Sequence, residues 1–517
     1  MPDSRNLEIS RRNLIQAVGG ITFLALVPTA TAAGVEHALD QQPLKARKGP
    51  LPLFIALPYL QAGPNGSKLV HGQESIVIAW QTNGVKAEYE LLYGEHDMAE
   101  TAKIAIGHRW SGDKSEGEQR INFSATLEGL KLGARYKYRV IMDGERILEG
   151  YFTTRKPRGT KVRFVAFGDN SYGEISDRAI AYQAYRAMPD FVMNTGDNVY
   201  ESGLDNEYAR YFFPIYNADE AGPRLGAPLL RSVPFYTVLA NHDVHGKDEN
   251  GVLCADFTKT LDALAYFTNM HLPLNGPVTK NSPRVIGPAK NVDAFKEIAA
   301  DRYPTMGNYS YDVGDLHFLC LDSNVYVDPT DAEYQRWIAS DLDGTDAAWK
   351  IVVYHHPAFN AGNEHYDEQH MRALSPLFEK HGVTMVLHGH EHTYQRSMPL
   401  KFAPKDLSGA QDVGGKQRLV PGTFTVDTNF DGHTRTVPDG VIYIVTGAGG
   451  KHLYDAAMND DSTKWTHEED DHVAYIAKFI CDRHSLSVVD ADARSISFRQ
   501  VDEWGNEVDA FRITKKA

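Results

Sequence analysis

Five short stretches of this sequence end in side chains that could bind metal ions. Each stretch follows an apolar run, and each carries aspartate, asparagine, tyrosine or histidine. They are Gly168-Asp169, Gly196-Asp197-Asn198-Val199-Tyr200, Asn241-His242-Asp243, Val352-Val353-Tyr354-His355 and Gly389-His390-Glu391-His392. A short apolar run that ends in a tight turn delivers the next side chains to the carboxyl end of a strand, where open α/β sheets bind their ligands. We therefore expect the five stretches to meet at one site.

The types of side chain in these stretches suit two hard metal ions. The candidate ligands are Asp169, Asp197, Tyr200, Asn241, His355, His390 and His392. This set is large enough for two ions if one aspartate bridges them. Two ions about 3.5–4 Å apart can activate a water and can bind both the attacking and the leaving oxygen when a phosphate ester is cleaved. Phenolate with carboxylate and imidazole suits Fe³⁺, whereas asparagine with imidazole suits Fe²⁺, Zn²⁺ or Mn²⁺. A trivalent ion lowers the pKa of a water that it holds, which predicts an acid optimum.

Competing chemistries find little support in the sequence. The three cysteines, Cys254, Cys320 and Cys481, lie far apart with no CxxC spacing, so we expect neither a disulfide framework nor a thiolate metal site. Cys320 falls in the apolar run 316–321 and is predicted to be a small core residue. We find no Ser-His-Asp order, nucleophilic cysteine or glycine-rich phosphate loop that could take the catalytic role.

Length and charge limit the class of protein and its partners. At 517 residues the chain is too long for one ordinary core, so two or more domains are expected. The formal net charge of −15 argues against a polyanion-binding surface, so we expect no specific nucleic-acid partner and only local recognition of phosphate. No internal apolar run is long enough to span a bilayer, so no membrane partner is expected once the leader is removed.

Residues 1–32 have the pattern of an export leader. Ser10-Arg11-Arg12-Asn13-Leu14-Ile15 resembles the twin-arginine signal, a moderately apolar stretch follows, and Ala30-Thr31-Ala32 supplies a cleavage pattern of small residues. The alternative is an uncleaved membrane anchor, for which the apolar stretch is short. We expect the twin-arginine machinery to export the protein folded, to the periplasm or outside the cell. Residues 33–50 are polar and predict a linker.

Residues 51–156 predict an all-β sandwich. Short runs such as 76–80, 88–93 and 136–141 alternate apolar and polar side chains between turn signals. The stretch Leu127-x-Gly129-Leu130-x-x-Gly133-x-x-Tyr136-x-Tyr138 resembles a fibronectin type III module. No cluster of catalytic residue types occurs here, so we expect a packing or substrate-shaping role.

Residues 161–517 predict a layered α/β domain that contains the metal site. Near-continuous apolar runs, typical of strands covered on both faces, occur at 162–167, 191–194, 235–239, 316–321, 351–354, 383–387 and 441–446. Ser176 is predicted to cap a helix that runs to Ala187, and residues 485–513 to complete a sheet. The segments 246–305 and 401–440 are irregular insertions, and whether the first covers the site stays open.

The five stretches resemble those of the purple acid phosphatases, within the calcineurin-like metallophosphoesterases. The resemblance covers about residues 51–517, including the fibronectin-like module that plant-type members carry, and Asp197-x-x-Tyr200 is its most specific feature. It implies a four-layer domain of two packed mixed β-sheets flanked by helices. It also implies that Asp169, Tyr200 and His392 bind Fe³⁺ with the bridging Asp197, and that Asn241, His355 and His390 complete a divalent site.

The resemblance also assigns two catalytic histidines. His242 would contact the substrate phosphate, and His365 would orient the phosphate or protonate the leaving oxygen. His356, beside His355, is expected to lie behind the ligands. The chain departs from the family pattern at Ser171 and Ala240, where glycine is usual, and this puts the fine geometry in question.

The resulting hypothesis is an exported acid phosphatase that hydrolyses small phosphomonoesters by attack of a metal-bound hydroxide. One alternative is a phosphodiesterase or nucleotide pyrophosphatase of the same superfamily. A third reading is a secreted binding protein on this fold that has lost its chemistry, against which the complete set of ligand residues argues.

Overall fold

The computed structural model describes residues 52–111, 118–258, 260–415, 417–454, 458, 459, 461, 465 and 474–516. These belong to one compact unit that spans Lys48–Ala517. The predicted leader at 1–32 and linker at 33–50 lie outside the described residues and stay predictions. None of the helices in the described part combines the length and the hydropathy that crossing a bilayer requires.

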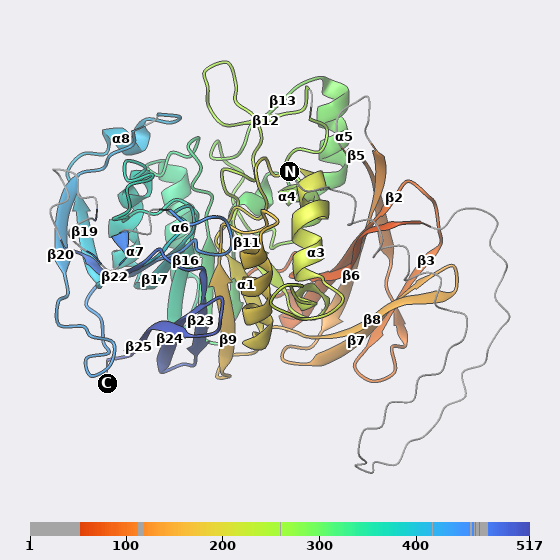
Figure 1. The fold of residues 1–517 in the computed structure, drawn as a ribbon, viewed down its shortest axis with the longest axis horizontal. Helices are drawn as coiled ribbons and strands as arrows, with labels where there is room; N and C mark the ends of the chain where they lie inside the picture. Colours follow the sequence, from red (N-terminus) through yellow and green to blue (C-terminus); the bar gives the residue numbers. More distant parts are fainter. Residues whose placement is uncertain are drawn as a thin grey trace, which may run out of the picture. The chain divides into compact units, whose positions relative to one another are not determined.

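The N-terminal region is mostly β, as predicted, and consists of two antiparallel four-stranded sheets (Figure 1). The first has the order β1 (Phe54–Gln61), β2 (Glu74–Asn83), β6 (Glu118–Leu130), β5 (Ile104–Ser111), and the second the order β4 (Glu100–Thr101), β3 (Tyr89–Gly94), β7 (Arg135–Met142), β8 (Glu145–Thr153). Strand β2 is buried on both faces: Ile78 and Trp80 pack between the two sheets, whereas Val77 and Ala79 join the core of the following region. The first sheet therefore packs directly against the rest of the molecule.

The remaining chain forms two mixed sheets. One has the order β11 (Phe235–Thr237), β10 (Phe191–Asn194), β9 (Val162–Phe167), β23 (Ser485–Ala491), β24 (Ser495–Asp502), β25 (Glu507–Thr514). The other has the order β14 (Tyr309–Val313), β15 (Leu316–Cys320), β16 (Trp349–Val353), β17 (Val383–His388), β21 (Ile442–Thr446), β18 (Tyr394–Ser397), β22 (Ile476–Ile480). The aromatic rings of Phe164 and Phe191, from the first sheet, pack edge-on against Phe318 of the second. The two sheets therefore face each other across a common core.

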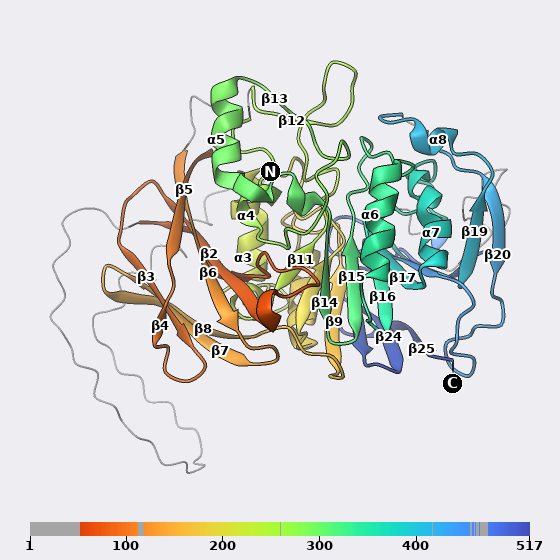
Figure 2. The same cartoon turned by 180° about the vertical axis from the view of Figure 1, so that it is seen from behind.

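Helices cover the outer faces of these sheets. On the first lie α1 (Ile175–Arg186) and α3 (Phe213–Tyr216), and on the second α6 (Ala332–Asp343) and α7 (Ser375–Lys380) (Figures 1 and 2). Strands β10, β15 and β17 consist almost entirely of buried residues, which is why their sequences read as continuous apolar runs. Cys320 is buried and free, as expected of a core residue. The layered order of helix, sheet, sheet and helix is the predicted one.

The predicted cap of the first helix is wrong. Helix α1 begins at Ile175, with Glu174 rather than Ser176 at the capping position. The carboxylate of Asp177 instead accepts hydrogen bonds from the backbone N–H groups of Ser171, Tyr172, Gly173 and Glu174. Asp177, inside the first turn, thus has the capping role predicted for Ser176, because its carboxylate accepts hydrogen bonds from backbone N–H groups of the preceding loop as well as of the helix end.

The two irregular segments contain short elements of their own. They are β12 (Ala255–Asp256), α4 (Tyr266–Asn269), β13 (Val285–Ile286) and α5 (Ala289–Ala299) in the first, and β19 (Leu400–Pro404), α8 (Ser408–Gln411) and β20 (Gly422–Val426) around the second. Helix α5 lies against β5 of the N-terminal region (Figure 2). The Tyr59 hydroxyl donates to the carbonyl of Asn269, and the Arg109 guanidinium donates to that of Ala263. The first segment therefore joins the β-rich region to the mixed sheets.

Candidate metal centre

The candidate ligands lie at the carboxyl ends of parallel strands in both mixed sheets. Asp169 and Asp197 follow β9 and β10, which pair in parallel, and His355 and His390 follow β16 and β17, which also pair in parallel. Backbone hydrogen bonds join the loops within each sheet, from Asp169 N–H to the Gly196 carbonyl and from Gly389 N–H to the His355 carbonyl. The backbone N–H of His390, in the second sheet, donates to the carboxylate of Asp169, in the first, so the two sheets present their loops to one shared space.

One group of donors surrounds the carboxylate of Asp169. The hydroxyl of Tyr200 lies 3.2 Å from Asp169 Oδ1 and 3.3 Å from His392 Nε2. His392 Nε2 lies 3.7 Å from the same carboxylate oxygen. The other nitrogen of this ring, Nδ1, lies 2.9 Å from the carbonyl of His452, and donation there leaves the Nε2 lone pair free for a metal.

A second group gathers at His355. Its Nε2 lies 3.3 Å from Asp197 Oδ2 and 3.2 Å from His390 Nδ1. It is also 4.0 Å from Asp169 Oδ1, which brings the two groups next to each other. His355 Nδ1 lies 2.9 Å from the carbonyl of Thr195, so this ring too is oriented through the nitrogen that faces away from the centre. His356 instead points toward Ser323 and Glu368.

Close packing and an unpaired oxygen show that the residues fit a metal. Asn241 Oδ1 is buried and has no hydrogen-bond partner among the described residues, and such an oxygen is costly unless something binds it. A Cβ at Gly389 would lie 2.6 Å from Asp169 Oδ2 and 2.9 Å from His355 Nδ1. A Cβ at Gly196 would lie 2.7 Å from His355 Nδ1. The two glycines therefore let the loops approach closely, and the donor set of oxygen and imidazole suits hard ions.

The backbone is strained where these side chains converge. Asp169, Asp197 and His390 have φ values of 58°, 50° and 69°, in the left-handed region that side chains other than glycine rarely adopt. His365 has a φ of 53°. Strain of this kind costs of order 1–3 kcal/mol per residue and clusters at functional sites, where it fixes the direction of a side chain.

The electrostatics of these side chains favour a bound cation. Burial raises the pKa of Asp169 to about 8, although the charge of His355 opposes this rise. Burial also acts to raise the pKa of Asp197, but His355 and His242 outweigh it and hold that pKa well below its usual range. The pKa of His355 is raised to about 9, because Asp197 outweighs the effect of burial. Protons therefore occupy positions that a metal would take, and binding would release them.

The two candidate catalytic histidines lie beside this centre. The ring of His242 is 4.6 Å from that of Tyr200, between centroids, and its Nδ1 lies 2.8 Å from the carbonyl of Glu201. The ring of His365 is 3.9 Å from that of His390, and its Nδ1 lies 3.2 Å from Glu368 Oε1. Both side chains are about one-third exposed, at 31% and 30%, so they can reach a substrate.

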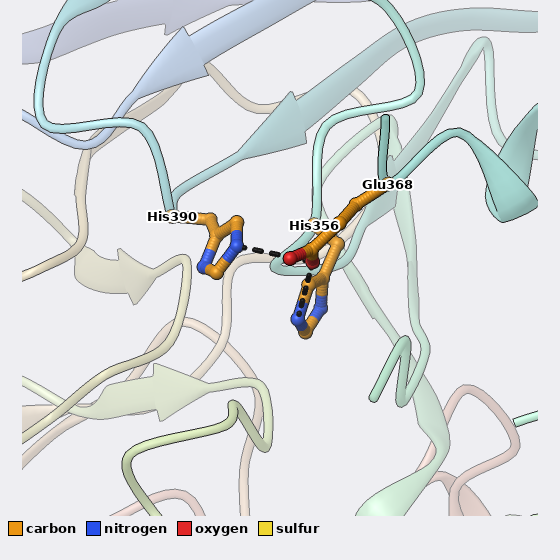
Figure 3. A group of neighbouring side chains, drawn as sticks. All are labelled: His356, Glu368 and His390. Carbon is orange, nitrogen blue, oxygen red and sulfur yellow. Dashed lines mark ion pairs between the residues drawn. The ribbon is translucent and has the colours of Figure 1, made fainter. Parts of the chain in front are cut away.

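Three further residues belong to this environment and were not predicted. Glu368 Oε2 lies 3.2 Å from His390 Nε2 and 3.6 Å from His356 Nε2, and Figure 3 shows the three side chains pointing toward one another. Lys451 and Tyr454 follow β21 and pack on Tyr200 and His392. The one signal that could have found Glu368 is its position three residues after His365.

The departures at Ser171 and Ala240 have different consequences. Ala240 does not have the positive φ that would require glycine, so the exchange carries no backbone penalty. Ser171 has a φ of 61°, in the region that glycine favours, and its N–H donates to Asp177. At Ser171 the backbone therefore keeps the left-handed conformation that glycine favours, and the serine side chain makes that conformation strained.

Comparisons with known proteins find similarity to a phosphoesterase family model and to relatives of low sequence identity. The family model for calcineurin-like phosphoesterase matches residues 162–394. Purple acid phosphatase 17 of Arabidopsis thaliana is 26% identical over 298 residues, which cover 55% of this chain and 78% of the relative. An uncharacterised protein of Mycobacterium tuberculosis is 24% identical over 489 residues, covering 87% of this chain and 79% of the relative.

Among solved structures, a purple acid phosphatase from yellow lupin (Lupinus luteus) seeds is similar, with a TM-score of 0.59. The alignment covers 88% of this chain and 74% of the lupin chain, at 16% sequence identity. At that identity the similarity shows a shared fold.

Proposed function

The chain contains a calcineurin-like metallophosphoesterase domain resembling that of the purple acid phosphatases, and on this premise we propose that it is an acid phosphatase. Its substrates are small phosphomonoesters. The observation that supports the proposal is the convergence of a phenol, two carboxylates and three imidazoles on one space: Asp169, Asp197, Tyr200, His355, His390 and His392. A second described group that could hold a metal ion, His356, Glu368 and His390, shares His390 with this set but has no phenol and only one carboxylate.

We assign the residues to two ions. Asp169, Tyr200 and His392 would hold Fe³⁺, Asn241, His355 and His390 would hold Fe²⁺, Zn²⁺ or Mn²⁺, and Asp197 would be shared. When bound, such a pair supplies an activated water at acid pH and neutralises charge on the phosphate. The carbonyls of Thr195 and His452 fix the rings of His355 and His392, so that the ligand nitrogens face the centre before any ion binds.

The two histidines beside the centre have separate tasks in this proposal. His242 donates a hydrogen bond to a phosphate oxygen and stabilises the charge that develops during displacement. His365 gives a proton to the leaving oxygen, and Glu368 holds its ring through Nδ1. Burial lowers the pKa of His365, but the hydrogen bond with Glu368 and the negative charges of Glu391, Glu368 and Glu364 together outweigh burial, and the net pKa is raised. The side chain is therefore kept in the protonated form that donation requires.

The test combines metal analysis with two chromogenic substrates. Native protein should hold iron and absorb visible light, and it should turn over p-nitrophenyl phosphate faster than bis(p-nitrophenyl) phosphate. A preference for the diester would favour a phosphodiesterase or nucleotide pyrophosphatase of the same superfamily. Metal-replete protein that cleaves neither would favour the non-catalytic binding protein, which the complete donor set argues against.

Two finer assignments accompany the proposal. We propose that the twin-arginine leader at 1–32 exports the protein to the periplasm or beyond the cell. We also propose that the β-rich region is a fibronectin type III module with a packing role, since its first sheet is buried against the mixed sheets. Export is tested by fractionating cells that carry Arg11→Lys/Arg12→Lys, which should retain the protein inside.

A further inference from the structure

Glu368 lies on a short turn beside the candidate centre. Its backbone N–H donates to the carbonyl of His365, at 3.1 Å. Two residues later the chain is anchored, because His370 Nε2 lies 2.7 Å from the carbonyl of Ser323. The hydroxyl oxygen of this serine accepts from the backbone N–H of the candidate ligand His355. The loop that carries Glu368 is therefore tied to the start of the loop that carries this ligand.

The two carboxylate oxygens of Glu368 face two different imidazoles. Oε1 lies 3.2 Å from His365 Nδ1, and Oε2 lies 3.2 Å from His390 Nε2 (Figure 3 shows the second contact). The first ring belongs to the residue to which we assign protonation of the leaving oxygen. The second ring belongs to a candidate ligand of the divalent ion. One side chain thus contacts both of these groups.

The contact with His390 lies on the outer side of that ring. The other nitrogen, Nδ1, lies 3.2 Å from His355 Nε2 and faces the centre. Neither Glu368 Oε2 nor His390 Nε2 has a hydrogen-bond partner elsewhere among the described residues. A metal-binding imidazole commonly donates from its outer nitrogen to a carboxylate, which fixes the orientation of the ring and makes the inner nitrogen a better ligand. Glu368 is placed to do this for His390.

The surroundings of Glu368 keep water away from this contact. The side chain of His356 is 1% exposed, and its Nε2 lies 3.6 Å from Glu368 Oε2. The side chain of His390 is 6% exposed and that of Glu368 is 22% exposed. Polar contacts are stronger where water is excluded. The three imidazoles that Glu368 contacts, on His356, His365 and His390, include none that we assign to Fe³⁺.

We infer that Glu368 is a positioning residue shared by the divalent site and the proton donor. This rests on the proposed function. Oε2 holds His390 so that its Nδ1 faces the divalent ion, and Oε1 holds His365 so that its Nε2 is left to face the leaving oxygen. Loss of Glu368 therefore weakens the divalent site and proton donation together, and it leaves the ferric site in place.

The first experiment measures the divalent site without any substrate. Zn²⁺ is titrated by calorimetry into iron-loaded protein from which the divalent ion has been removed. We expect Glu368→Ala to weaken Zn²⁺ binding by about 10–100-fold, because His390 loses the carboxylate that orients it. The visible band of the iron should persist, which also reports that the site is folded.

Two further variants separate position from charge. Glu368→Asp keeps a carboxylate but is shorter by one C–C bond, about 1.5 Å, so it should weaken Zn²⁺ binding as well. The matched control is Glu364→Gln, which removes an exposed carboxylate four residues earlier in the same loop. It should bind Zn²⁺ nearly as tightly as wild type, since solvent screens an exposed charge. A Glu368→Asp variant that binds Zn²⁺ like wild type would overturn the positioning role.

The second experiment measures proton donation at saturating Zn²⁺. The ratio of kcat for ethyl phosphate to kcat for p-nitrophenyl phosphate should fall about 10–100-fold in Glu368→Ala, because ethoxide needs a proton in order to leave. A fall in Zn²⁺ affinity without a fall in this ratio, or the reverse, would contradict the shared role. If wild type hydrolyses neither ester but Glu368→Ala still weakens Zn²⁺ binding, the proposed function fails and the role of Glu368 at the divalent ion stands.

A different role for Glu368 would give a different stoichiometry. His356, Glu368 and His390 lie close enough together to hold an ion of their own. A further Zn²⁺ that wild type binds and Glu368→Ala lacks, with the first Zn²⁺ bound equally by both, would make Glu368 a ligand and would overturn the inference. Loss of the iron band together with Zn²⁺ binding would also overturn it.

Discussion

The ammonium group of Lys451 lies 4.3 Å from the ring centroid of Tyr200. The same group lies 3.3 Å from the ring of Tyr172 and 2.5 Å from Glu201 Oε1, and its side chain is 6% exposed. A buried positive charge thus rests on the face of the phenol that we assign to Fe³⁺. Because a nearby cation stabilises a phenolate, Lys451 should both favour metal binding and tune the electronic transition of the bound phenolate.

Replacing Lys451 should change the colour of the iron-loaded protein. Without the cation the phenolate electrons lie higher in energy, so transfer of charge to Fe³⁺ needs less energy. We expect Lys451→Met to move the visible absorption band to longer wavelength, and Lys451→Arg to leave it near its wild-type position. A band that stays in place in fully loaded Lys451→Met would show that this cation does not act on Tyr200.

His365 should matter most for substrates whose leaving group needs a proton. An alkoxide leaves poorly unless it is protonated, whereas p-nitrophenolate leaves readily. We expect His365→Asn to lower kcat for an alkyl phosphate by about 10²–10⁴-fold and to lower kcat for p-nitrophenyl phosphate far less. The comparison needs only the ratio of the two rates in each variant. An equal loss on both substrates would instead mean that His365 positions the phosphate.

Removing Asp205 should destabilise the contact between the β-rich region and the mixed sheets. Its fully buried carboxylate accepts from Arg120 at 2.6 Å, Asn269 at 2.8 Å and Gln81 at 3.0 Å. Asp205→Ala would leave the guanidinium of Arg120 buried without its partner, at a cost of roughly 3–5 kcal/mol in the free energy of unfolding. Urea denaturation measures this loss.

The matched control is an exposed ion pair. Asp219, 64% exposed, lies 2.8 Å from Arg231, and Asp219→Ala should hardly move the urea midpoint because solvent screens such pairs. Equal midpoints for the Asp205 and Asp219 variants would contradict the assigned importance of the buried contact.

A second buried ion pair gives the fold a dependence on pH. The ring of His317 lies between Asp312, at 2.7 Å, and Asp341, at 2.9 Å. Burial lowers its pKa, but the two carboxylates outweigh burial and raise the pKa from 6.5 to about 9. A raised pKa means that the folded state binds the proton more tightly, so the stabilisation is complete below about pH 6.5 and is lost as pH rises through about 9. By the usual conversion it amounts to roughly 3 kcal/mol.

The test of this pair compares wild type with His317→Gln across that range of pH. The difference between their urea midpoints should be largest near pH 6 and should shrink toward pH 9.5. A difference that is constant across the range would mean that His317 stabilises the fold by packing alone.

Much of this architecture could be predicted because local patterns decide it. Strands β9 and β10 occupy the predicted ranges, since fully covered strands need continuous apolar runs. The positions of Asp169 and His355 followed from the same runs, because a buried strand must deliver the next residues to its carboxyl end. Residues 485–513 do complete a sheet, as strands β23 to β25.

The features of the site that the sequence did not predict depend on contacts between segments that are distant in the sequence. Glu368, Lys451 and Tyr454 lie on loops whose course has no periodicity, so the sequence could not place them against His390, Tyr200 and His392. The left-handed backbone at Asp169 and Asp197 is likewise imposed by packing around the centre, against the preference of an aspartate side chain. The predicted cap of α1 is wrong for a similar reason. Asp177 accepts hydrogen bonds from the backbone of the loop before the helix, and the helix pattern in the sequence does not indicate how that loop folds.

The central claim is that Asp197 is shared by two ions, one of them held by the phenolate of Tyr200. The most direct measurement is elemental analysis with a visible spectrum, for wild type, Asp197→Asn and Tyr200→Phe. We predict two ions per wild-type chain including iron, loss of both metal and activity in Asp197→Asn, and loss of the visible band in Tyr200→Phe. A colourless, iron-free wild type, or an Asp197→Asn variant with full metal content and full activity, would contradict it.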